Sequence, residues 1–216
     1  MTDRASFLAA IRATPRGDDP GLPDRLDTPD APTELVTGED LLDRFQMELE
    51  AVSAIVSRAL RDDVGAAVVA SLQAAGAYTI ALADDLGPLL NSVRDACVAT
   101  GLDVASYTDI AQQRARIGAL DATVTGCLRA VAATGSIVTS APTGRASALI
   151  APTHVCVVRQ EQVLPGLHAL FDGDALAGAG SQFALQSGPS RSSDIEKTLI
   201  LGVHGPGRVH VIVVPS

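Results

Sequence analysis

Tryptophan is absent from the sequence, and all aromatic residues together make up only 3% of its 216 positions. Apolar residues nevertheless account for 47% of the chain, so a sizeable core has to be built from Ala, Val, Leu and Ile. Such cores are typical of buried parallel sheets with covering helices. The length suits one large domain, or one domain with appendages.

Clustered metal ligands are missing too. The chain has three cysteines that lie far apart and form no CxxC motif: Cys97, Cys127 and Cys156. This pattern predicts neither a disulfide framework nor an iron–sulphur cluster in this chain. His204 and His210 are six residues apart, which is not a helical ligand spacing, and His154 lies in an apolar run. We therefore expect no bound metal ion and no cofactor.

Excess positive charge is a further absence. The formal net charge is −9, and residues 1–60 carry twelve acidic residues against six arginines, whereas residues 131–216 carry five acidic against five basic residues. Because no basic stripe is present to neutralise phosphates, we expect binding neither to nucleic acid nor to an anionic membrane surface. No apolar run has the length of a signal or membrane-spanning segment. The expected location is the cytoplasm.

The N-terminal region differs in composition from the rest of the chain. Residues 6–12 have the pattern of a short amphipathic helix. Residues 14–33 contain five prolines and five aspartates, which is typical of an extended connector that buries too little apolar surface to fold alone. We expect residues 1–37 to form a helix and a connector, and residues 38–216 to form one α/β domain.

Apolar strands alternate with helices through the next part of the chain. Helices are predicted from Glu39 onward, over 62–76 and over 87–101. Strands are predicted over 77–83 and 102–107, and residues 51–58 form either a strand or an extension of the preceding helix. Such alternation predicts β-α-β crossovers and a mainly parallel sheet.

The second half has a different pattern. Residues 129–158 predict two strands joined by SAPTGRAS (140–147) as a polar turn, which would be an antiparallel hairpin insertion. Further elements are expected in the order helix, strand, helix, strand, over 163–171, 183–187, 194–202 and 208–214. The fold class is therefore α/β, with a doubly wound, mostly parallel sheet and an antiparallel hairpin insertion.

Two common catalytic or cofactor motifs fail on their context. GAGSQF (178–183) and GPGRVH (205–210) both lead into strands, so neither has the strand-turn-helix context of a dinucleotide site. GPSRS (188–192) places Ser190 between a predicted strand and helix, as in a nucleophile elbow, but Ser192 replaces the second glycine. A Ser190 hydrolase is accordingly disfavoured.

An anion-binding loop is the interpretation that the residues favour. The strand over 183–187 is expected to bring the chain to the carboxyl edge of the sheet, and Ser193 to Glu196 form an S-x-x-E capping box that starts a helix. A helix N-terminus preceded by serines, glycine and arginine attracts carboxylates and phosphates. The residues expected to bind the ligand are Ser187, Gly188, Ser190, Arg191 and Ser192, with Thr134, Gly135 and Ser136 as the opposite wall and His204 at the margin. The alternative is that this loop only makes a turn, with Arg191 paired to Asp194 or Glu196.

Three segments together resemble one protein family. SGPSRSSDIEKTLILGVHGPGRVHVIVV (187–214) closely resembles the C-terminal signature of the LUD-domain family, in particular its lactate-utilisation branch. AATGSIVTS (132–140) and APTHVCVV (151–158) resemble two further landmarks of that family in the same order. One departure is Ala133, at a position where the family usually has an acidic residue.

The resemblance implies both a fold and a function. The family fold is similar to that of ribose-phosphate isomerase, glucosamine-phosphate deaminase and the CoA transferases. The implied function is a part in the oxidation of L-lactate to pyruvate, together with iron–sulphur partner proteins and with a small anionic ligand. Two alternatives stay open: a stand-alone enzyme acting on a CoA- or sugar-phosphate-type substrate, and a structural adaptor for the iron–sulphur partners. An activity that needs the acidic residue at position 133 is put in doubt by Ala133.

Overall fold

The computed structural model describes residues 40–140, 145–180, 182–192 and 200–215, together with Ser6 and Ala9. The chain divides into two compact units, Met1–Thr33 and Glu34–Ser216. Ser6 and Ala9 are both helical, in agreement with the helix predicted over 6–12. The predicted connector over 14–33 lies outside the described residues, and so does the capping box that begins at Ser193.

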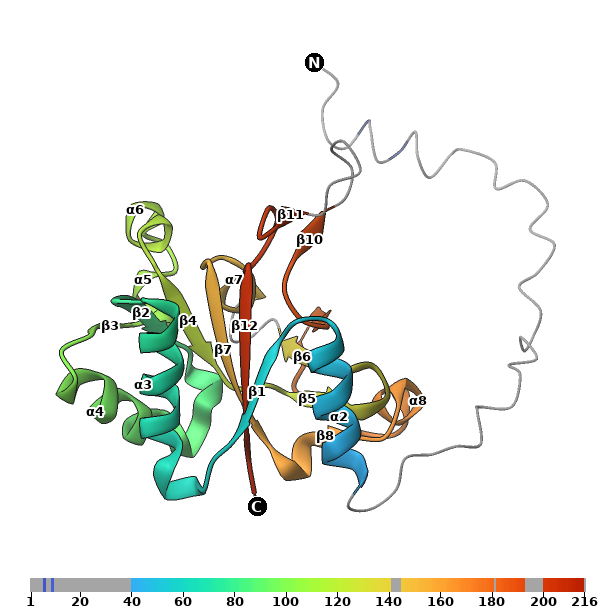
Figure 1. Ribbon diagram of the computed structural model, residues 1–216. Helices are drawn as coiled ribbons and strands as arrows, with labels where there is room; N and C mark the ends of the chain where they lie inside the picture. The colour runs from blue at the N-terminus through green and yellow to red at the C-terminus, as the bar shows by residue number, and fades with distance from the viewer. Residues whose placement is uncertain are drawn as a thin grey trace. The chain divides into compact units, whose positions relative to one another are not determined.

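A six-stranded sheet forms the centre of the second unit (Figure 1), with the strand order β1-β12-β7-β4-β2-β3. All neighbouring strands in this sheet are parallel. The strands are β1 (Ile55–Arg58), β2 (Thr79–Leu82), β3 (Asp103–Ser106), β4 (Ala122–Thr125), β7 (Thr153–Arg159) and β12 (Arg208–Val214). The predicted parallel sheet is therefore confirmed. The strand β4 was not predicted, since no element was assigned between residues 107 and 129.

Both faces of this sheet are covered. In β7, Val155 and Val157 belong to one apolar core, while Cys156 and Val158 belong to another, as the alternation of side chains along a strand requires. The first core contains α3 (Val64–Ala75) and α4 (Leu90–Ala99), which are preceded by the 3-10 helices η1 (Arg61–Asp63) and η2 (Asp84–Leu89). The second core contains α2 (Asp40–Ala51), which lies on the other side of the sheet in Figure 1.

A smaller sheet packs on the side of α2, with the strand order β8-β5-β6-β9. Its strands are β5 (Arg129–Val131), β6 (Ser136–Ser140), β8 (Val163–Leu164) and β9 (Phe183–Gln186). The pairs β5–β6 and β6–β9 are antiparallel, and β5–β8 is parallel. Short helices complete the connections: η3 (Ala132–Thr134), α5 (Tyr107–Ile110), α6 (Arg114–Gly118), α7 (Arg145–Leu149), η4 (Gln160–Gln162) and α8 (Leu167–Phe171).

The hairpin predicted across SAPTGRAS is wrong, because β6 and β7 lie in different sheets, and the antiparallel pair in this region is β5–β6. The reversal takes place at η3 and Gly135, whose φ of 56° is a left-handed conformation that glycine adopts readily. Within SAPTGRAS, Arg145 instead begins α7, which leads to β7. β7 belongs to the large sheet, and all but one of its residues are buried. Such burial on both faces is typical of a central parallel strand.

The helix predicted over 194–202 is wrong at its end. Ile200–Leu201 form strand β11, which pairs antiparallel with β10 (Arg191–Ser192). A short apolar run fits a strand as well as a helix, and the β10 partner decides between them here. Gly202, with a φ of 80°, then ends β11 in a left-handed turn.

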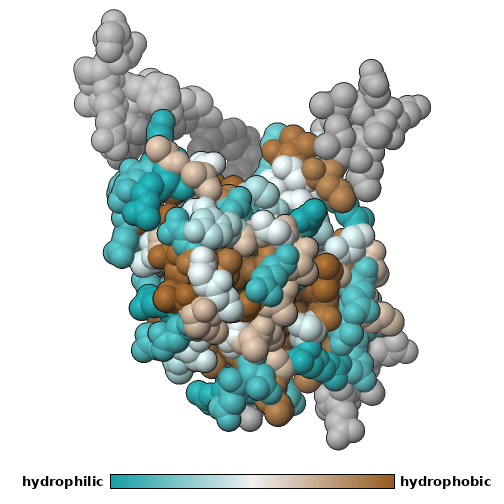
Figure 2. Space-filling model, turned by 60° about the vertical axis from the view of Figure 1, so that its left-hand side comes forward, coloured by the Kyte–Doolittle hydropathy of each residue, from teal (hydrophilic) through white to brown (hydrophobic). Residues whose placement is uncertain are grey.

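No helix in the described part of the chain is long and apolar enough to cross a membrane. On the face seen in Figure 2, apolar surface is divided into patches by hydrophilic residues. Such a mixed surface is ordinary for a folded chain.

Candidate functional site

The loop expected to bind an anion lies at a different edge of the sheet from the one predicted. Ser190 N donates to Pro206 O at 2.9 Å, two residues before β12 begins. Gly188 lies against Val52, three residues before β1. The loop therefore adjoins the amino ends of the parallel strands. The expected carboxyl edge is wrong, because β9 pairs with β6 in the small sheet and does not belong to the parallel one.

A chain of hydroxyl groups connects both predicted walls of the site. Thr134 Oγ1 lies 2.7 Å from Ser136 Oγ, which lies 2.6 Å from Ser187 Oγ. Thr134 and Ser187 are exposed and Ser136 is buried. The structure thus brings together residues that are 51 positions apart in sequence, as expected for two walls of one site.

The two glycines beside these hydroxyls are explained by packing. A Cβ on Gly135 would lie 2.7 Å from Leu49 N, and a Cβ on Gly188 would lie 2.6 Å from Val52 Cγ2. Both distances are shorter than any that real Cβ atoms tolerate. Both glycines also have positive φ. Their nearest neighbours are therefore the C-terminal end of α2 and the residue after it, which is a structural role.

Arg191 is exposed, and its Nη2 donates to Ser53 Oγ at 2.9 Å. Asp194 and Glu196, the alternative partners, lie outside the described residues. Ser192 is half-buried beside Arg191 in β10. Among the described residues, the bond to Ser53 uses one of the five N–H groups of the Arg191 guanidinium.

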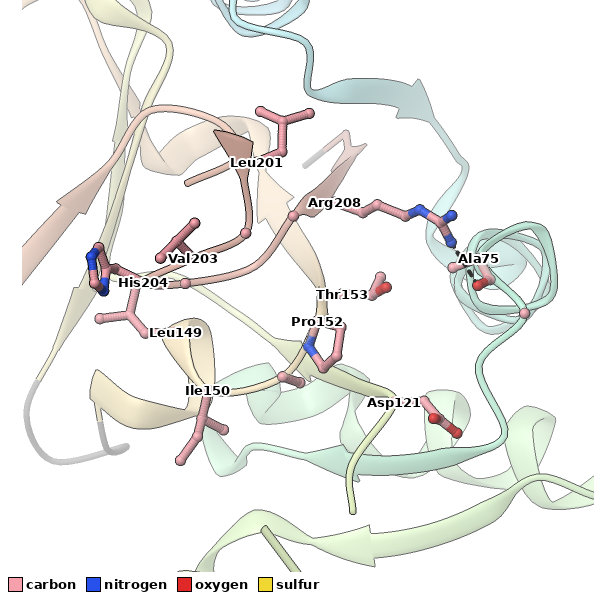
Figure 3. A pocket seen from close by; sticks show the side chains of 15 residues that line it. Ala75, Asp121, Leu149, Ile150, Pro152, Thr153, Leu201, Val203, His204 and Arg208 are labelled. Carbon is pink, nitrogen blue, oxygen red and sulfur yellow. Dashed lines mark hydrogen bonds between the residues drawn. The ribbon is translucent and has the colours of Figure 1, made fainter. Parts of the chain in front are cut away.

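A pocket of about 600 Å³ lies next to this loop and is the main candidate for a ligand site (Figure 3). Three of its lining residues, Asp121, Thr153 and Arg208, stand just before or at the beginning of parallel strands. Leu201 to Gly205 form another wall of the pocket. Leu201 belongs to β11, which pairs with β10 in the predicted anion loop. Among the predicted ligand residues, His204 is the one that lines this pocket.

The turn that positions His204 is held by backbone contacts. Gly202 N donates to Ser190 O at 2.9 Å, and His204 N donates to Ser190 Oγ at 3.4 Å. Gly202 and Gly207 approach so closely that a Cβ on Gly202 would lie 3.1 Å from Gly207 Cα. The glycines of this segment therefore close a compact turn, and the His204 side chain is exposed at its tip.

Two charged side chains lie on one side of the pocket, near the end of α3 (Figure 3). Arg208 Nη1 donates to Ala75 O at 2.8 Å, and Arg208 N donates to Pro152 O at 3.2 Å. Asp121 Oδ2 accepts hydrogen bonds from Tyr78 N and Thr79 N, at 2.9 and 2.8 Å. One arginine terminal nitrogen and one carboxylate oxygen have no further partner among the described residues, so the pair offers both a donor and an acceptor to a ligand.

Sequence reasoning missed both residues of this pair. Asp121 precedes the unpredicted strand β4, and Arg208 was assigned only to a closing strand. The signal that was present is their position: Asp121 directly precedes the apolar strand β4, and Arg208 is the first residue of the apolar strand β12.

A second group of polar residues is buried between the two sheets. His154 Nε2 lies 2.8 Å from Thr125 Oγ1, and His154 Nδ1 lies 2.9 Å from Gln186 Oε1. Burial lowers the pKa of His154 to about 4, although the hydrogen bond to Gln186 acts in the opposite direction. The imidazole is therefore neutral at physiological pH and connects β7 to β4 and β9. This agrees with a core histidine rather than a metal ligand.

The cysteines are also core residues. Cys97, Cys127 and Cys156 are all buried and unpaired. Burial raises the pKa of Cys97 to about 11 and raises that of Cys156 well above its ordinary value, with the Cys127 thiol adding to the second effect. Protonated thiols of this kind act as small hydrophobic groups. Within the described residues, no cluster of three or more His, Cys, Asp or Glu side chains could hold a metal ion.

Ala133 occupies an exposed position in η3, and its N–H donates to Pro165 O at 3.1 Å. An acidic side chain at this position would extend from the turn that carries Thr134 and Ser136. With alanine at position 133, this residue brings no charge to the hydroxyl chain.

Comparisons with known proteins agree on one family. A family model described as LUD domain matches residues 42–214. A lactate utilization protein C of Deinococcus radiodurans is 39% identical over 104 residues, covering 46% of this chain and 49% of that protein. A lactate utilization protein C of Bacillus licheniformis is 30% identical over 110 residues, covering 47% of this chain and 45% of that protein. The chain therefore matches about half the length of these relatives.

A solved structure has the same fold. The crystal structure of a DUF162 family protein from Deinococcus radiodurans matches with a TM-score of 0.61 and 23% identity. The match covers 81% of this chain and 96% of the other. At this identity the similarity concerns the fold alone.

Proposed function

The chain belongs to the LUD domain family, and on that premise we propose that it takes part in the utilisation of L-lactate and binds a small organic anion in the pocket beside β11. The observation that carries the first part is the similarity to two lactate utilization proteins C over nearly half of the chain. The second part rests on Arg208, which is the arginine among the pocket-lining residues.

Arg208 suits the role of principal charge better than Arg191 does. Both arginines are exposed, but Arg208 lines the pocket, whereas Arg191 lies outside the lining and donates to Ser53. Two backbone groups fix the arginine at position 208, through its N–H to Pro152 O and through its Nη1 to Ala75 O. A guanidinium held in this way is ordered before the ligand arrives, which reduces the entropy lost on binding.

The loop from Ser187 to Ser192 then supports the pocket from outside. Ser190 holds the turn that carries His204, while Ser187 joins the hydroxyl chain of Thr134 and Ser136. These residues remain candidates for direct ligand contacts, with Gly135, Gly188 and Ser192 as their structural neighbours.

The proposed partners are iron–sulphur proteins of the same lactate-utilisation system. The redox chemistry of lactate oxidation needs an electron acceptor, and the described residues of this chain contain no metal-ligand cluster. We therefore propose a division of labour between this chain and cluster-bearing partners.

An adaptor role is the second candidate, and exposed apolar side chains favour it. Phe171 in α8 and Leu185 in β9 are 62% and 42% exposed. Phe171 also contacts Phe183 of β9, with 6.2 Å between ring centroids. Apolar residues that remain exposed on neighbouring elements are typical of a protein contact.

Growth on L-lactate tests the proposal. A strain that lacks the gene should fail to grow on L-lactate but grow normally on pyruvate, and the wild-type chain should restore growth. Arg208→Ala should restore it poorly, while Phe171→Ser with Leu185→Ser should restore it fully if the chain acts through its pocket. The opposite outcome, with the Phe171 and Leu185 variant failing and Arg208→Ala succeeding, would favour the adaptor. Normal growth of the deletion strain on L-lactate would reject both.

A further inference from the structure

Thr123 and Thr139 have buried hydroxyl groups that no other described residue satisfies. Thr123 in β4 is 1% exposed and Thr139 in β6 is 3% exposed, and neither Oγ1 atom has a hydrogen-bond partner in the described part of the chain. A hydroxyl group that leaves water without forming a new hydrogen bond costs free energy. Folded proteins therefore satisfy nearly all of their buried polar side-chain atoms, either with other protein groups or with enclosed water.

The hydroxyl group of Thr123 faces the small sheet. Thr123 pairs with His154 of β7, whereas its neighbours Ala122 and Val124 belong to the core on the side of α3. Because side chains alternate along a strand, Thr123 points to the opposite face of the large sheet. On that face, His154 Nδ1 lies 2.9 Å from Gln186 Oε1 of β9.

Thr139 faces the same gap from the other side. It comes two residues after Ile137, which belongs to the core between the small sheet and β12, so both side chains point towards the large sheet. Ile137 pairs with Gln186, and Thr139 pairs with Ala184. Thr139 therefore lies on the face of the small sheet that carries the contact of Gln186 with His154.

The gap next to these hydroxyl groups suits water. Two packed sheets lie about 10 Å apart, and the residues paired with Thr123 and Thr139 include the alanines Ala81 and Ala184. Small side chains fill less of that distance than large ones do. The helix α7 contacts both β4 and β6, and its Ser147 is buried, so α7 covers this end of the gap. Folded proteins enclose on the order of one buried water per about 27 residues, at polar sites of this kind.

We propose that water is enclosed between the two sheets next to α7, where it forms hydrogen bonds with the hydroxyl groups of Thr123 and Thr139. Water fits these groups because it both donates and accepts hydrogen bonds. It adds β4 and β6 to the polar connection that His154 and Gln186 make between β7 and β9. A buried polar network whose members are all satisfied favours one arrangement of the elements that it joins. The inference concerns a site other than the pocket beside β11, so it does not depend on the proposed function.

Urea unfolding of Thr123→Val and Thr139→Val tests the inference. Valine has nearly the shape of threonine, so each variant removes a hydroxyl group with little change in volume. If the hydroxyl group binds water, its loss should raise the equilibrium constant for unfolding about two- to tenfold. If it has no partner at all, a methyl group is easier to bury, and the variant should be more stable than wild type. An unchanged or lowered constant in either variant overturns the inference.

Thr79→Val in β2 is the matched control. Thr79 is only half-buried, so this variant should change the equilibrium constant for unfolding by less than about twofold.

A crystal structure of the same chain locates the water directly. At a resolution that shows ordered water, a water oxygen should lie about 2.5 to 3.0 Å from each of the two threonine Oγ1 atoms. The corresponding density should be missing beside position 123 or 139 in the valine variants. A wild-type structure without water at either hydroxyl group overturns the inference, even if the valine variants are destabilised.

Discussion

Gly135 shows how a motif residue acquires a structural role. It ends the η3 turn with a φ of 56° and packs against the backbone of Leu49 and Glu48 in α2. The sequence Thr134-Gly135-Ser136 was predicted as part of a ligand wall. Gly135 forms the turn between Thr134 and Ser136, and the hydroxyl of Ser136 contacts that of Ser187.

Replacing Gly135 with alanine should destabilise the protein through two effects. A positive φ costs an alanine about 1 to 2 kcal/mol, and overlap of the new Cβ with Leu49 N adds to this. Gly101→Ala is the matched control, because Gly101 has a φ of 78° but no atom within 4 Å of an added Cβ. Urea unfolding should show a larger loss for Gly135→Ala than for Gly101→Ala. Equal losses would mean that the contact with α2 does not matter.

His154 makes stability depend on pH in a defined direction. Its folded-state pKa of about 4 lies below the ordinary value of 6.5, so below about pH 6.5 the unfolded chain takes up a proton that the folded chain does not. The contribution to stability is therefore complete above pH 6.5 and is lost as the pH falls towards 4, up to about 3 kcal/mol.

In His154→Gln, the free energy of unfolding should depend less steeply on pH in the acid range than it does in wild type. This variant should be less stable than wild type at pH 7, because it disturbs the bonds to Thr125 and Gln186. Between pH 6.5 and 4, however, its free energy of unfolding should fall less steeply. His210, whose pKa is lowered by burial and by Arg208, contributes equally in both proteins. The free energies of unfolding are measured by urea unfolding at each pH. The same dependence on pH in both proteins would contradict a buried, neutral His154.

At the scale of elements, α2 connects the two sheets. Its Phe45 and Leu49 are fully buried in the core that includes β12 of the large sheet and Ile137 of the small sheet. The apolar spacing of this helix was visible in the sequence, whereas its contact with the η3 turn depends on the tertiary fold.

Leu49→Ala should lower the free energy of unfolding by about 2 to 5 kcal/mol, because it creates a cavity at this junction. Met47 on the same helix is 53% exposed, so Met47→Ala should change stability by less than about 0.5 kcal/mol. Chemical unfolding of both variants checks the difference. A small effect of Leu49→Ala would show that α2 is not part of the cooperative core.

The elements that were predicted and those that were missed differ in their physical basis. The helices α3 and α4 and the strand β12 have clear periodicity and glycine or polar boundaries, and all three are confirmed. β4 has four residues, and β11 has two and depends on pairing with β10. β2 and β3 also have four residues but were predicted from their places between helices, whereas no element was assigned around β4, and the two residues of β11 form a strand only through their pairing with β10.

The same limit applied to the candidate site. The hydroxyl residues were predicted together as two walls of one anion site, although strand pairing was not known. Arg208 and Asp121 line one pocket only through the order β12-β7-β4, which the sequence does not reveal. The loop was predicted at the wrong edge of the parallel sheet for a related reason. β9 belongs to the second sheet because it pairs with β6, which is far away in sequence.

At the scale of the whole molecule, the fold and the family are established, and the function is a proposal built on them. The large sheet is parallel and is covered on both faces, as predicted. The predicted likeness to ribose-phosphate isomerase, glucosamine-phosphate deaminase and the CoA transferases stays a prediction, as does the boundary after residue 37. The proposed function depends most on the binding of an organic anion in the pocket through Arg208.

Titration of L-lactate into the wild-type chain, Arg208→Ala and Arg191→Ala tests that claim most directly. A charge-assisted bond contributes about 1.5 to 3 kcal/mol, so Arg208→Ala should lose about ten- to hundredfold in affinity. Arg191→Ala should bind nearly as well as wild type, because Arg191 lies outside the pocket lining. The reverse result, with affinity lost in Arg191→Ala and kept in Arg208→Ala, would move the ligand to the Ser187–Ser192 loop and contradict the account.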